Sequence, residues 1–466
     1  MRPLVMKFGG SSVADADCLR QVASLVQAAL PRAPLVVLSA MGKSTDALFD
    51  LARRAARRDP DGFTERARAL IDRHRRVADE LSCGTELAPT FAQAEAELDL
   101  MLRAVAHLRA LGAPEMDAIA SLGERLSTEI LAAFLRAQGV ATTLLDARVV
   151  MRTDDRHGAA APQMAEITAL CAEHVRPHLG PGKVAVVQGY VGGTREGVTT
   201  TLGRGGSDYS AALFGAALDA AEVQVWTDVE GVLTADPRLV PDALPIPELS
   251  FAEAAELAAF GAKVLHPSTM QPVIERGIPV TVRHTRKPDG RFTKIALGTT
   301  SGRPVTALAA RGPITVMTVT STRMLAQPGF LARLFDVFAR ARVSVDLIAT
   351  AEISVSLTVE HDAPVEALAR EISAFANVTI ARDRAIVALV GERLKKTNGL
   401  AARAFAALGD VDVEMLSMGA NEINLSFVVS AAAMPVAVRR LHDRLLGAGS
   451  RDGAPVVNLG AAQEAK

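Results

Sequence analysis

The sequence predicts an α/β protein with a mainly parallel sheet, followed by two small α+β modules. The first observation is a short apolar strand near the N-terminus that leads into a glycine turn, a helical pattern over 17–30 and a second apolar strand over 35–38. This alternation of strand, turn, helix and strand is typical of βαβ units. The second observation is an order of elements that occurs twice after about residue 313, which predicts a duplicated module.

Length and charge restrict the class of protein. The chain has 466 residues, too many for one ordinary hydrophobic core, so we expect two or three domains. Lys and Arg together number 51 and Asp and Glu 52, which leaves a formal charge of -1. This charge gives no global attraction to nucleic acid or to an anionic membrane. We therefore expect small molecules and protein partners as ligands.

Cysteine usage and the N-terminal residues predict a cytoplasmic protein. The scattered Cys18, Cys83 and Cys171 favour a reducing compartment over a disulfide framework. The first residues do not have the pattern of a signal or transit peptide. No apolar stretch is long enough to span a bilayer, so we expect no membrane partner.

The first domain is expected to cover residues 1–300. Residues 47–111 are rich in Ala, Arg, Leu and Glu, which predicts several helices over or beside the sheet. Strand and turn signals return at 184–188 and 223–227. The pattern dissolves near 283–313 into Lys, Asp, Gly, Thr, Ser and Pro, which places a domain boundary at about 300–313.

The two C-terminal modules are expected at residues 313–383 and 384–466. For the first, the sequence predicts strands at 314–321, 345–349, 353–359 and 378–381 and helices at 330–342 and 365–375. For the second, it predicts strands at 385–390, 411–418 and 424–429 and helices at 400–408 and 436–446. A last strand at 456–459 is expected to return to the first module.

The segment Lys7-Phe8-Gly9-Gly10-Ser11-Ser12 lies between a strand and a helical pattern. Paired glycines allow the backbone to approach a phosphate, and the following helix offers unpaired N–H groups to an anion. Lys7 adds a positive charge for a transferring phosphoryl group. The alternative interpretation is a tight turn with a solvated lysine.

A second loop, at Ser39–Thr45, favours hydroxyl contacts to a ligand. Its end, Gly42-Lys43-Ser44-Thr45, resembles the end of a Walker A loop, but the required first glycine would fall at Val37 inside a strand. A P-loop nucleotide triphosphatase is therefore disfavoured. Ser39 and Thr45 remain candidate hydroxyl donors at the carboxyl end of a strand.

The segment Thr199–Ser210 contains three hydroxyls before Leu202, three glycines, Arg204 and Asp208. Arg204 is suited to bind a carboxylate through two hydrogen bonds. Asp208 is expected at a helix start, where the alternative role is a cap. Glu124 follows Gly123 at another expected helix start, where the helix dipole by itself favours a carboxylate.

Two later segments suit a nucleotide. Trp226–Arg238 supplies turn residues and polar groups for a base and ribose directly after an apolar strand. In Gly261–Pro267, Lys263 is a candidate phosphate ligand, although an isolated lysine is normally just solvated. His266 is interpreted as a core or capping histidine.

Taken together and in this order, these segments resemble aspartate kinases of the amino-acid kinase fold, in which a mainly parallel sheet carries helices on both faces. The match is carried by Lys7–Ser12, Gly203–Asp208, Thr227-Asp228-Val229-x-Gly231 and Gly261–Pro267. The resemblance covers essentially the entire chain. It implies transfer of the γ-phosphoryl group of ATP to the β-carboxylate of L-aspartate.

The resemblance also implies a role for each matching residue. Lys7 and Asp208 are the catalytic pair, in which Asp208 orients Lys7 or the substrate ammonium group. Arg204 pairs with the α-carboxylate of aspartate and Glu124 faces its amino group. The full substrate-binding set is Ser39, Thr45, Glu124, Arg204 and Ser207. The full ATP-binding set is Lys7, Gly9, Gly10, Tyr190, Thr227, Asp228, Arg238, Lys263 and Val264. Leu233 stands where many relatives carry tyrosine and is left out of that set.

This reaction agrees with the residue chemistry. A substrate carboxylate is already a nucleophile at neutral pH, so the site needs no strong general base. Transfer depends on positioning and on neutralising phosphate charge with lysine and Mg²⁺. We expect Mg²⁺ to be carried with ATP, the co-substrate, and no metal site on the protein itself.

The C-terminal modules resemble paired ACT domains, which bind amino acids at subunit interfaces. The resemblance implies a homodimer or homotetramer formed through these domains. Asp346 and Glu352 are suited to pair with ammonium groups, which favours L-lysine as the effector. The implied effector site is Met324, Gln327, Gly329, Phe330, Leu331, Val345, Asp346, Thr350 and Glu352.

Alternatives remain open for both parts. Met324, Phe330 and Leu331 also fit a hydrophobic core, and Ala351 stands where relatives frequently have serine. Threonine, or a second effector such as S-adenosylmethionine, remains possible. The chain also fits a kinase of another carboxylate or carbamate, or a catalytically silent amino-acid-binding regulator. The intact Lys7, Glu124, Arg204 and Asp208 argue against the silent regulator.

Overall fold

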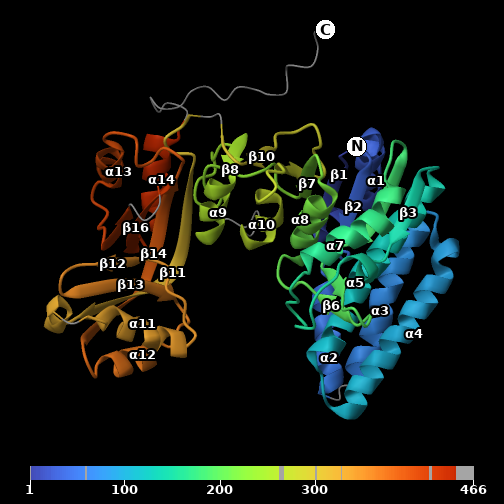
Figure 1. The fold of residues 1–466 in the computed structure, drawn as a ribbon, viewed down its shortest axis with the longest axis horizontal. Coiled ribbons are helices and arrows are strands. Elements are labelled where there is room, and N and C mark those ends of the chain that lie inside the picture. Colours follow the sequence, from blue (N-terminus) through green and yellow to red (C-terminus); the bar gives the residue numbers. More distant parts are fainter. Residues whose placement is uncertain are drawn as a thin grey trace, which may run out of the picture. The chain divides into compact units, whose positions relative to one another are not determined.

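The structure is a computed structural model that describes residues 2–57, 60–261, 267–299, 302–326, 328–418 and 422–447. The chain forms two compact units (Figure 1). The first unit contains residues 1–232 and 264–298, and the second contains residues 233–263 and 299–466. Among the described residues, none of the helices is both long enough and apolar enough to cross a bilayer.

The first unit is built on a mainly parallel sheet. Its strands lie in the order β3-β4-β2-β1-β7-β9-β10, and only β10 runs antiparallel to its neighbour. The central strands are almost entirely apolar and buried, as expected when helices cover both faces of a parallel sheet. The strands are β1 Leu4–Phe8, β2 Pro34–Leu38, β3 Ala141–Leu145, β4 Lys183–Gln188, β7 Glu222–Thr227, β9 Val280–His284 and β10 Thr293–Ala296.

Helices pack around this sheet, and a separate ribbon, β5 Val191–Gly193 with β6 Thr199–Thr201, lies after β4. The predicted helical region 47–111 consists of three helices, of which the long α3 and α4 run alongside each other (Figure 1). The helices are α1 Ala16–Ala29, α2 Ser44–Ala56, α3 Pro60–Glu80, α4 Gly84–Leu108, α5 Ala113–Ala137, α6 Ala147–Val150, α7 Met164–Leu170, α8 Gly206–Leu218 and α10 Pro267–Ile274.

The strand order reverses at β1, which pairs with β2 on one side and with β7 on the other. Because these strands are parallel, their carboxyl ends meet at one edge of the sheet. Open α/β sheets bind ligands in the crevice outside this edge, where the order reverses. The predicted loops at Gly9, Ser39, Tyr190 and Asp228 all start there.

The second unit contains one six-stranded sheet in the order β12-β13-β11-β14-β16-β15. Each half of the sheet has the same arrangement. From one edge inward the strands are β12, β13 and β11, and from the other edge inward they are the corresponding strands β15, β16 and β14. This symmetry bears out the duplicated module. The elements are β11 Ala307–Thr320, α11 Phe330–Arg340, β12 Ile348–Thr350, β13 Ser354–Glu360, α12 Val365–Ile372, β14 Asn377–Val390, α13 Leu400–Leu408, β15 Met415–Met418, β16 Asn424–Ser430 and α14 Met434–Leu445.

Several predicted strand limits in this unit are wrong. Residues 307–313, expected in a loop, belong to β11, because Ala307–Ala310 pair with the apolar end of β14. The two strands expected at 378–381 and 385–390 form the single strand β14. The strands expected at 345–349 and 411–418 are shorter and start later, as β12 and β15. The expected strand at 456–459 lies outside the described residues.

The segment 233–261 packs into the second unit although it directly follows the nucleotide motif. Thr234 Oγ1 lies 2.9 Å from His442 Nε2, and the Arg439 guanidinium donates to the Leu239 carbonyl over 3.0 Å. Ala235 and Val240 share a buried cluster with side chains of α13, β16 and α14. The segment also contains β8 Glu248–Ser250 and α9 Phe251–Ala259, where Ser250 and Glu253 form a capping box.

Candidate active site

A cavity of about 550 Å³ lies at the carboxyl ends of β1, β2 and β4 in the first unit. It collects groups from segments far apart in the chain. Every residue of the predicted substrate set lines it, together with both members of the predicted catalytic pair and two further residues of the predicted ATP-binding set, Gly10 and Tyr190. These predicted residues are Lys7, Gly10, Ser39, Thr45, Glu124, Tyr190, Arg204, Ser207 and Asp208.

Lys7 and Asp208 form an ion pair in this cavity. Lys7 Nζ lies 2.7 Å from Asp208 Oδ1. Lys7 is only 8 % exposed because it is part of the buried strand β1. Asp208 lies in the first turn of α8, and its carboxylate reaches Lys7. The pair holds an ammonium group at the mouth of the glycine turn.

The glycine turn after β1 requires glycine for a steric reason. A Cβ atom at Gly10 would lie 2.7 Å from the Gly42 carbonyl oxygen, so only glycine fits between the two loops. The turn continues into a short 3-10 helix, Gly10–Val13, and α1 begins at Ala16. The Asp15 carboxylate already accepts from Cys18 N at the start of α1. The helix that directly follows the glycine turn is therefore the 3-10 helix Gly10–Val13, which has no side-chain cap, whereas one backbone N–H at the start of α1 is already taken by Asp15.

Glu124 lies in the middle of α5, so the predicted helix start at this residue is wrong. Gly123 is a mid-helix glycine because a Cβ there would lie 2.8 Å from Ala40 Cβ. Glu124 is 3 % exposed, and burial raises its pKa to about 8, against the opposing effect of hydrogen bonds from the Ala40 backbone and the Thr45 side chain. One carboxyl oxygen, Oε2, has no hydrogen-bond partner. A buried polar atom facing a cavity without a partner indicates a ligand group.

Arg204 is carried by the loop between β6 and α8. Gly203 and Gly205 on either side of it have positive φ angles of 76° and 71°, which favour glycine. Arg204 is exposed and makes no ion pair within the described part of the chain. Its guanidinium is therefore available to a carboxylate ligand.

Tyr190 forms the wall of the cavity next to this loop. Its pKa is raised to about 12 by burial, with the Thr201 side chain as a hydrogen-bond partner. Gly206 leaves room for the ring, because a Cβ there would lie 2.6 Å from Tyr190 Cδ2. The Tyr190 backbone N–H donates to Ser210 Oγ over 2.9 Å, which ties the wall to α8.

The predicted nucleotide residues do not gather in the same cavity. Thr227 and Asp228 line a neighbouring cavity of about 340 Å³, together with Ser11 and Ser12 of the glycine turn. Arg238 belongs to the second unit, where it is exposed and pairs with Asp236. Lys263, Val264 and His266 lie outside the described residues, as does Gln327 of the effector set.

Sequence reasoning missed several residues of the site. Asp46, Phe49 and Gly158 line the main cavity without having been singled out. Asp46 follows Thr45 on the first turn of α2, and its place in a loop-to-helix junction was an available signal. Gly158 lies in an irregular segment between α6 and α7 that carries no motif, so no sequence signal pointed to it.

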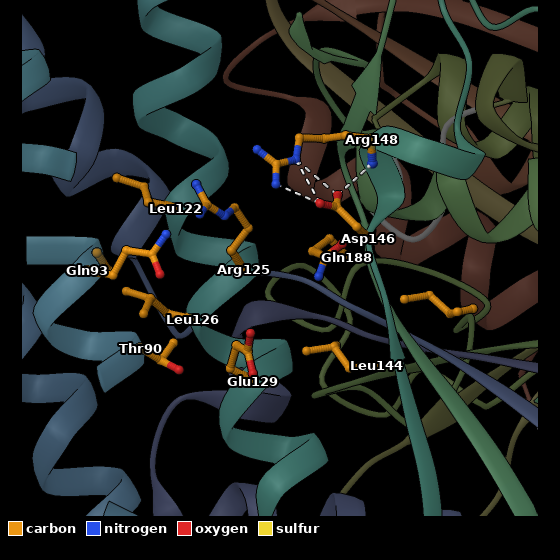
Figure 2. A pocket seen from close by; sticks show the side chains of 12 residues that line it. Thr90, Gln93, Leu122, Arg125, Leu126, Glu129, Leu144, Asp146, Arg148 and Gln188 are labelled. Carbon is orange, nitrogen blue, oxygen red and sulfur yellow. Dashed lines mark hydrogen bonds and ion pairs between the residues drawn. The ribbon is translucent and has the colours of Figure 1, made fainter. Parts of the chain in front are cut away.

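A third cavity, of about 300 Å³, lies between α4, α5 and the end of β3 (Figure 2). Its guanidinium groups are already paired. Arg148 binds Asp146, as Figure 2 shows, and Arg125 makes two hydrogen bonds to Glu97 at 2.7 and 3.0 Å. None of the residues predicted for the site lines this cavity, so it is distinct from the candidate active site.

The predicted effector residues of the second unit lie around the first ACT-like module. Phe330 is buried in its core, and Met324 and Val345 pack against that core. Leu331, Thr350 and Glu352 are exposed, and Gly329 starts α11 with a φ angle of 89°. Asp346 Oδ2 lies 3.2 Å from the Arg311 guanidinium, so its charge already has a partner.

Among the residues that the structure describes, no group of three or more His, Cys, Asp or Glu side chains is arranged to hold a metal ion. In the main cavity the Asp208 carboxylate is already paired with Lys7.

Comparison with known proteins gives one consistent result. Residues 2–284 match the amino acid kinase family, and residues 317–370 and 387–445 match an ACT domain. The chain is 37 % identical to lysine-sensitive aspartokinase 3 of Escherichia coli, covering 95 % of this chain and 99 % of that protein. It is 36 % identical to the chloroplastic aspartokinase 1 of Arabidopsis thaliana, covering 96 % of this chain and 80 % of that protein.

Comparison with solved structures indicates the same family. Two crystal structures of E. coli aspartokinase III, one with lysine and aspartate and one with aspartate and ADP, each match with a TM-score of 0.80. Each match covers 95 % of this chain and 99 % of the other, at 37 % identity. Together with the converging Lys7, Glu124, Arg204 and Asp208, these matches establish that the chain belongs to the aspartokinase family, with an amino acid kinase domain followed by ACT domains.

Proposed function

We propose that the main cavity binds L-aspartate beside the phosphate end of ATP, and that its residues direct the γ-phosphoryl group to the β-carboxylate of aspartate. The observation that carries this proposal is the meeting of a buried lysine, an unpartnered carboxyl oxygen and an available guanidinium in one cavity. An α-amino acid has one cationic and one anionic group at its α-carbon. Glu124 and Arg204 offer the opposite charges.

The roles follow from these charges. Glu124 accepts the α-ammonium group, and Arg204 binds the α-carboxylate through two hydrogen bonds. Ser39, Thr45 and Ser207 complete the polar lining around the substrate. Because the α-ammonium and α-carboxylate groups of the substrate are both bound, only its β-carboxylate remains free to approach the phosphates at the glycine turn.

The chemical step needs no proton transfer. A β-carboxylate oxygen forms a bond to the γ-phosphorus, and the bond from that phosphorus to the bridging β,γ-oxygen breaks. The bridging oxygen keeps the electron pair and leaves on ADP. Lys7 neutralises the charge on the transferring oxygens, and Asp208 holds its ammonium group in position. Gly9 and Gly10 allow the backbone to approach the phosphates.

The nucleotide extends from this turn toward Thr227 and Asp228. Their cavity shares the Gly10–Val13 segment with the phosphate site, which supports a base and ribose position there. Arg238, Lys263 and Val264 are proposed as further nucleotide residues on the resemblance to aspartate kinases alone. Mg²⁺ enters with ATP, held by phosphate oxygens and water.

Trapping of the acyl phosphate with hydroxylamine tests the catalytic proposal. We expect a hydroxamate that requires both L-aspartate and ATP, and none with L-glutamate in place of aspartate. Product with glutamate, or equal product with no amino acid added, would remove L-aspartate as the substrate.

We further propose that L-lysine inhibits the enzyme at the first ACT domain. The E. coli relative is a lysine-sensitive enzyme, and a crystal structure of it contains lysine. Glu352 is exposed beside β12 and provides a carboxylate for an ammonium group. The proposed cytoplasmic location is supported by Cys18, Cys83 and Cys171, which are buried and form no disulfide with one another.

A homodimer or homotetramer formed through the ACT domains is part of the same proposal. Large apolar side chains are exposed on both modules, at Leu331, Ile348 and Ile353 of the first and at Phe405, Leu416 and Met418 of the second. Exposed apolar surface on short edge strands is typical of a protein interface.

Titration with amino acids separates the possible effectors. L-lysine is expected to lower the rate and raise the melting temperature of the enzyme, because a ligand that binds the folded state stabilises it. The same titration with L-threonine, alone and with S-adenosylmethionine, serves as the comparison. Inhibition by threonine but not by lysine would contradict the effector assignment.

A further inference from the structure

The Asp117 carboxylate is buried on α5 outside the predicted substrate set. Asp117 is only 1 % exposed. Its oxygens accept from Thr201 Oγ1 over 2.5 Å, from Thr201 N over 3.2 Å and from Gly158 N over 3.0 Å. His157 Nδ1 lies 2.9 Å from Asp117 Oδ2.

These donors belong to the two segments that form one wall of the active-site cavity. Thr201 ends β6, and the loop that follows carries Arg204. The Thr201 carbonyl accepts from Ala160 N over 2.9 Å. The 158–160 segment is therefore joined to Thr201 directly and also through Asp117, to which both Gly158 N and Thr201 donate. Gly158 and Gly203 both line the cavity, and a Cβ at Gly203 would lie 3.1 Å from the Gly158 carbonyl oxygen.

The same helix carries Glu124. Asp117 and Glu124 are seven residues apart on α5, about two helical turns or roughly 10 Å along the axis, and so lie on nearly the same face. Glu124 faces the cavity directly, whereas Asp117 holds the base of the Arg204 loop. One rigid helix therefore connects the two charged groups that are proposed to hold the α-carbon of the substrate.

We propose that Asp117 is a positioning residue that sets the separation between Glu124 and Arg204 and thereby the binding of the amino-acid substrate. The inference rests on the proposed roles of Glu124 and Arg204. It predicts an effect on aspartate binding that acts through the Arg204 loop, with the ATP site left in place. A general structural anchor would instead change stability without separating the two substrates.

Asp117→Asn is the main test. An amide retains one acceptor oxygen but turns its second polar atom toward donors, which leaves buried N–H or O–H groups without a partner. The KM for aspartate is expected to rise about tenfold or more, while the KM for ATP stays within about twofold, since separate sites contribute independently. Steady-state kinetics with each substrate varied in turn measures both.

A double-mutant cycle with Arg204→Ala shows whether Asp117 acts through Arg204. In the Arg204→Ala background, Asp117→Asn is expected to have almost no further effect on the aspartate KM. Asp146→Asn is the matched control, because Asp146 is a part-buried carboxylate that accepts from backbone Arg148 N and does not line this cavity. Its aspartate KM is expected to equal that of the wild type.

Thr201→Val provides a second variant if Asp117→Asn does not fold, since it removes the hydroxyl that donates to Asp117 and is also a hydrogen-bond partner of Tyr190. A several-fold rise in the aspartate KM with an unchanged ATP KM supports the proposal. Equal changes in both KM values, or additive effects in the cycle, would overturn it while leaving the proposed function intact. Absence of aspartate-dependent product from the wild type would instead overturn the proposed function, and this inference with it.

Discussion

The two binding regions of the molecule differ in how complete they are within one chain. In the catalytic unit, Lys7, Glu124 and Asp208 are buried or part-buried and converge on one cavity. In the ACT unit, the polar residues proposed for the effector, such as Thr350 and Glu352, are exposed, and Asp346 is already paired with Arg311. The fold of one chain therefore assembles the catalytic cavity, whereas the residues proposed for the effector lie on the exposed surface of the ACT unit.

This difference predicts how substitutions in the catalytic cavity and in the ACT unit affect the enzyme. A preorganised cavity acts through fixed charges, so removing one side chain has a large and local effect. Under the proposed association of ACT domains, a second copy of the chain completes this surface, and its response then depends on the oligomeric state. The following predictions test this contrast, from the largest expected effect to the smallest.

Lys7→Ala is expected to produce the largest effect, a fall in kcat of about 100- to 1000-fold, because a fixed positive charge at the transferring phosphoryl group is lost. Initial rates at saturating aspartate and ATP measure it. Lys43→Ala is the matched control, since Lys43 is an exposed lysine beside the neighbouring glycine turn and does not line the cavity. Equal losses in the two variants would contradict the role of Lys7.

Arg204→Ala is expected to raise the KM for aspartate by about 10- to 100-fold, because a charge-assisted bidentate contact is lost. The change in kcat is expected to be smaller. Arg195→Ala, which removes an exposed arginine paired with Glu166, serves as the control. An unchanged aspartate KM in Arg204→Ala would exclude the proposed α-carboxylate contact.

Ile348→Glu is expected to abolish inhibition by lysine while the uninhibited rate is retained. Ile348 is 43 % exposed on the edge strand β12, and a charge there disfavours association of two copies. Sedimentation velocity and a lysine titration measure the two effects together. Leu100→Glu, at an exposed leucine of α4 in the catalytic unit, is expected to change neither. Full lysine inhibition of a monomeric Ile348→Glu variant would show that one chain completes the effector site.

Glu124 is expected to make stability depend on pH. Its carboxyl titrates near 4.5 when exposed and near 8 in the folded protein. Between these values the folded protein holds a proton that the unfolded chain has released, so the free energy of unfolding falls as pH rises from about 5 to 8. Melting temperatures of wild type and Glu124→Gln across this range measure the difference, since glutamine does not titrate.

Aspartate is expected to reverse this effect, because its ammonium group favours the ionised carboxylate. Binding at pH 7 then releases a proton, which calorimetry in buffers of different ionisation enthalpy detects. Parallel pH profiles for wild type and Glu124→Gln would show that Glu124 does not titrate in this range.

Ala351→Ser is expected to produce the smallest effect. A new hydroxyl in the proposed effector site adds about one hydrogen bond, which strengthens lysine inhibition by about two- to tenfold. The lysine concentration for half inhibition measures it. A weaker response to lysine would place residue 351 outside the site or in contact with an apolar part of the effector.

Much of the architecture could be predicted from sequence, because apolar periodicity reports which face of an element is buried. The parallel sheet and the duplicated C-terminal module are confirmed by the structure and by the family matches. The limits of β11 were predicted wrongly, since Ala307–Ala310 is mostly alanine and is followed by Gly312 and Pro313, which resembles a loop. Their strand conformation comes from pairing with the distant β14, which no local pattern reports.

The candidate active site was likewise predicted only in part from the sequence. Glycine, hydroxyl and charge patterns pointed to Lys7, Arg204 and Asp208 as separate motifs. Glu124 was placed at a helix start because glycine is a poor helix residue, whereas the close approach of Ala40 requires glycine within α5. Asp117 was missed because an aspartate in a helical pattern is usually solvated, and its donors lie 40 to 84 residues away.

The sequence by itself determined the elements, the chemistry available and the resemblance to aspartate kinases, because these depend on residue type and local spacing. Only the tertiary structure decided which groups meet. It joined Lys7 to Asp208, buried Glu124 deeply enough to raise its pKa to about 8, and assigned residues 233–263 to the unit that holds the ACT domains. Desolvation and hydrogen bonding depend on atoms brought together from distant parts of the chain, which is why these properties follow from packing and not from motif.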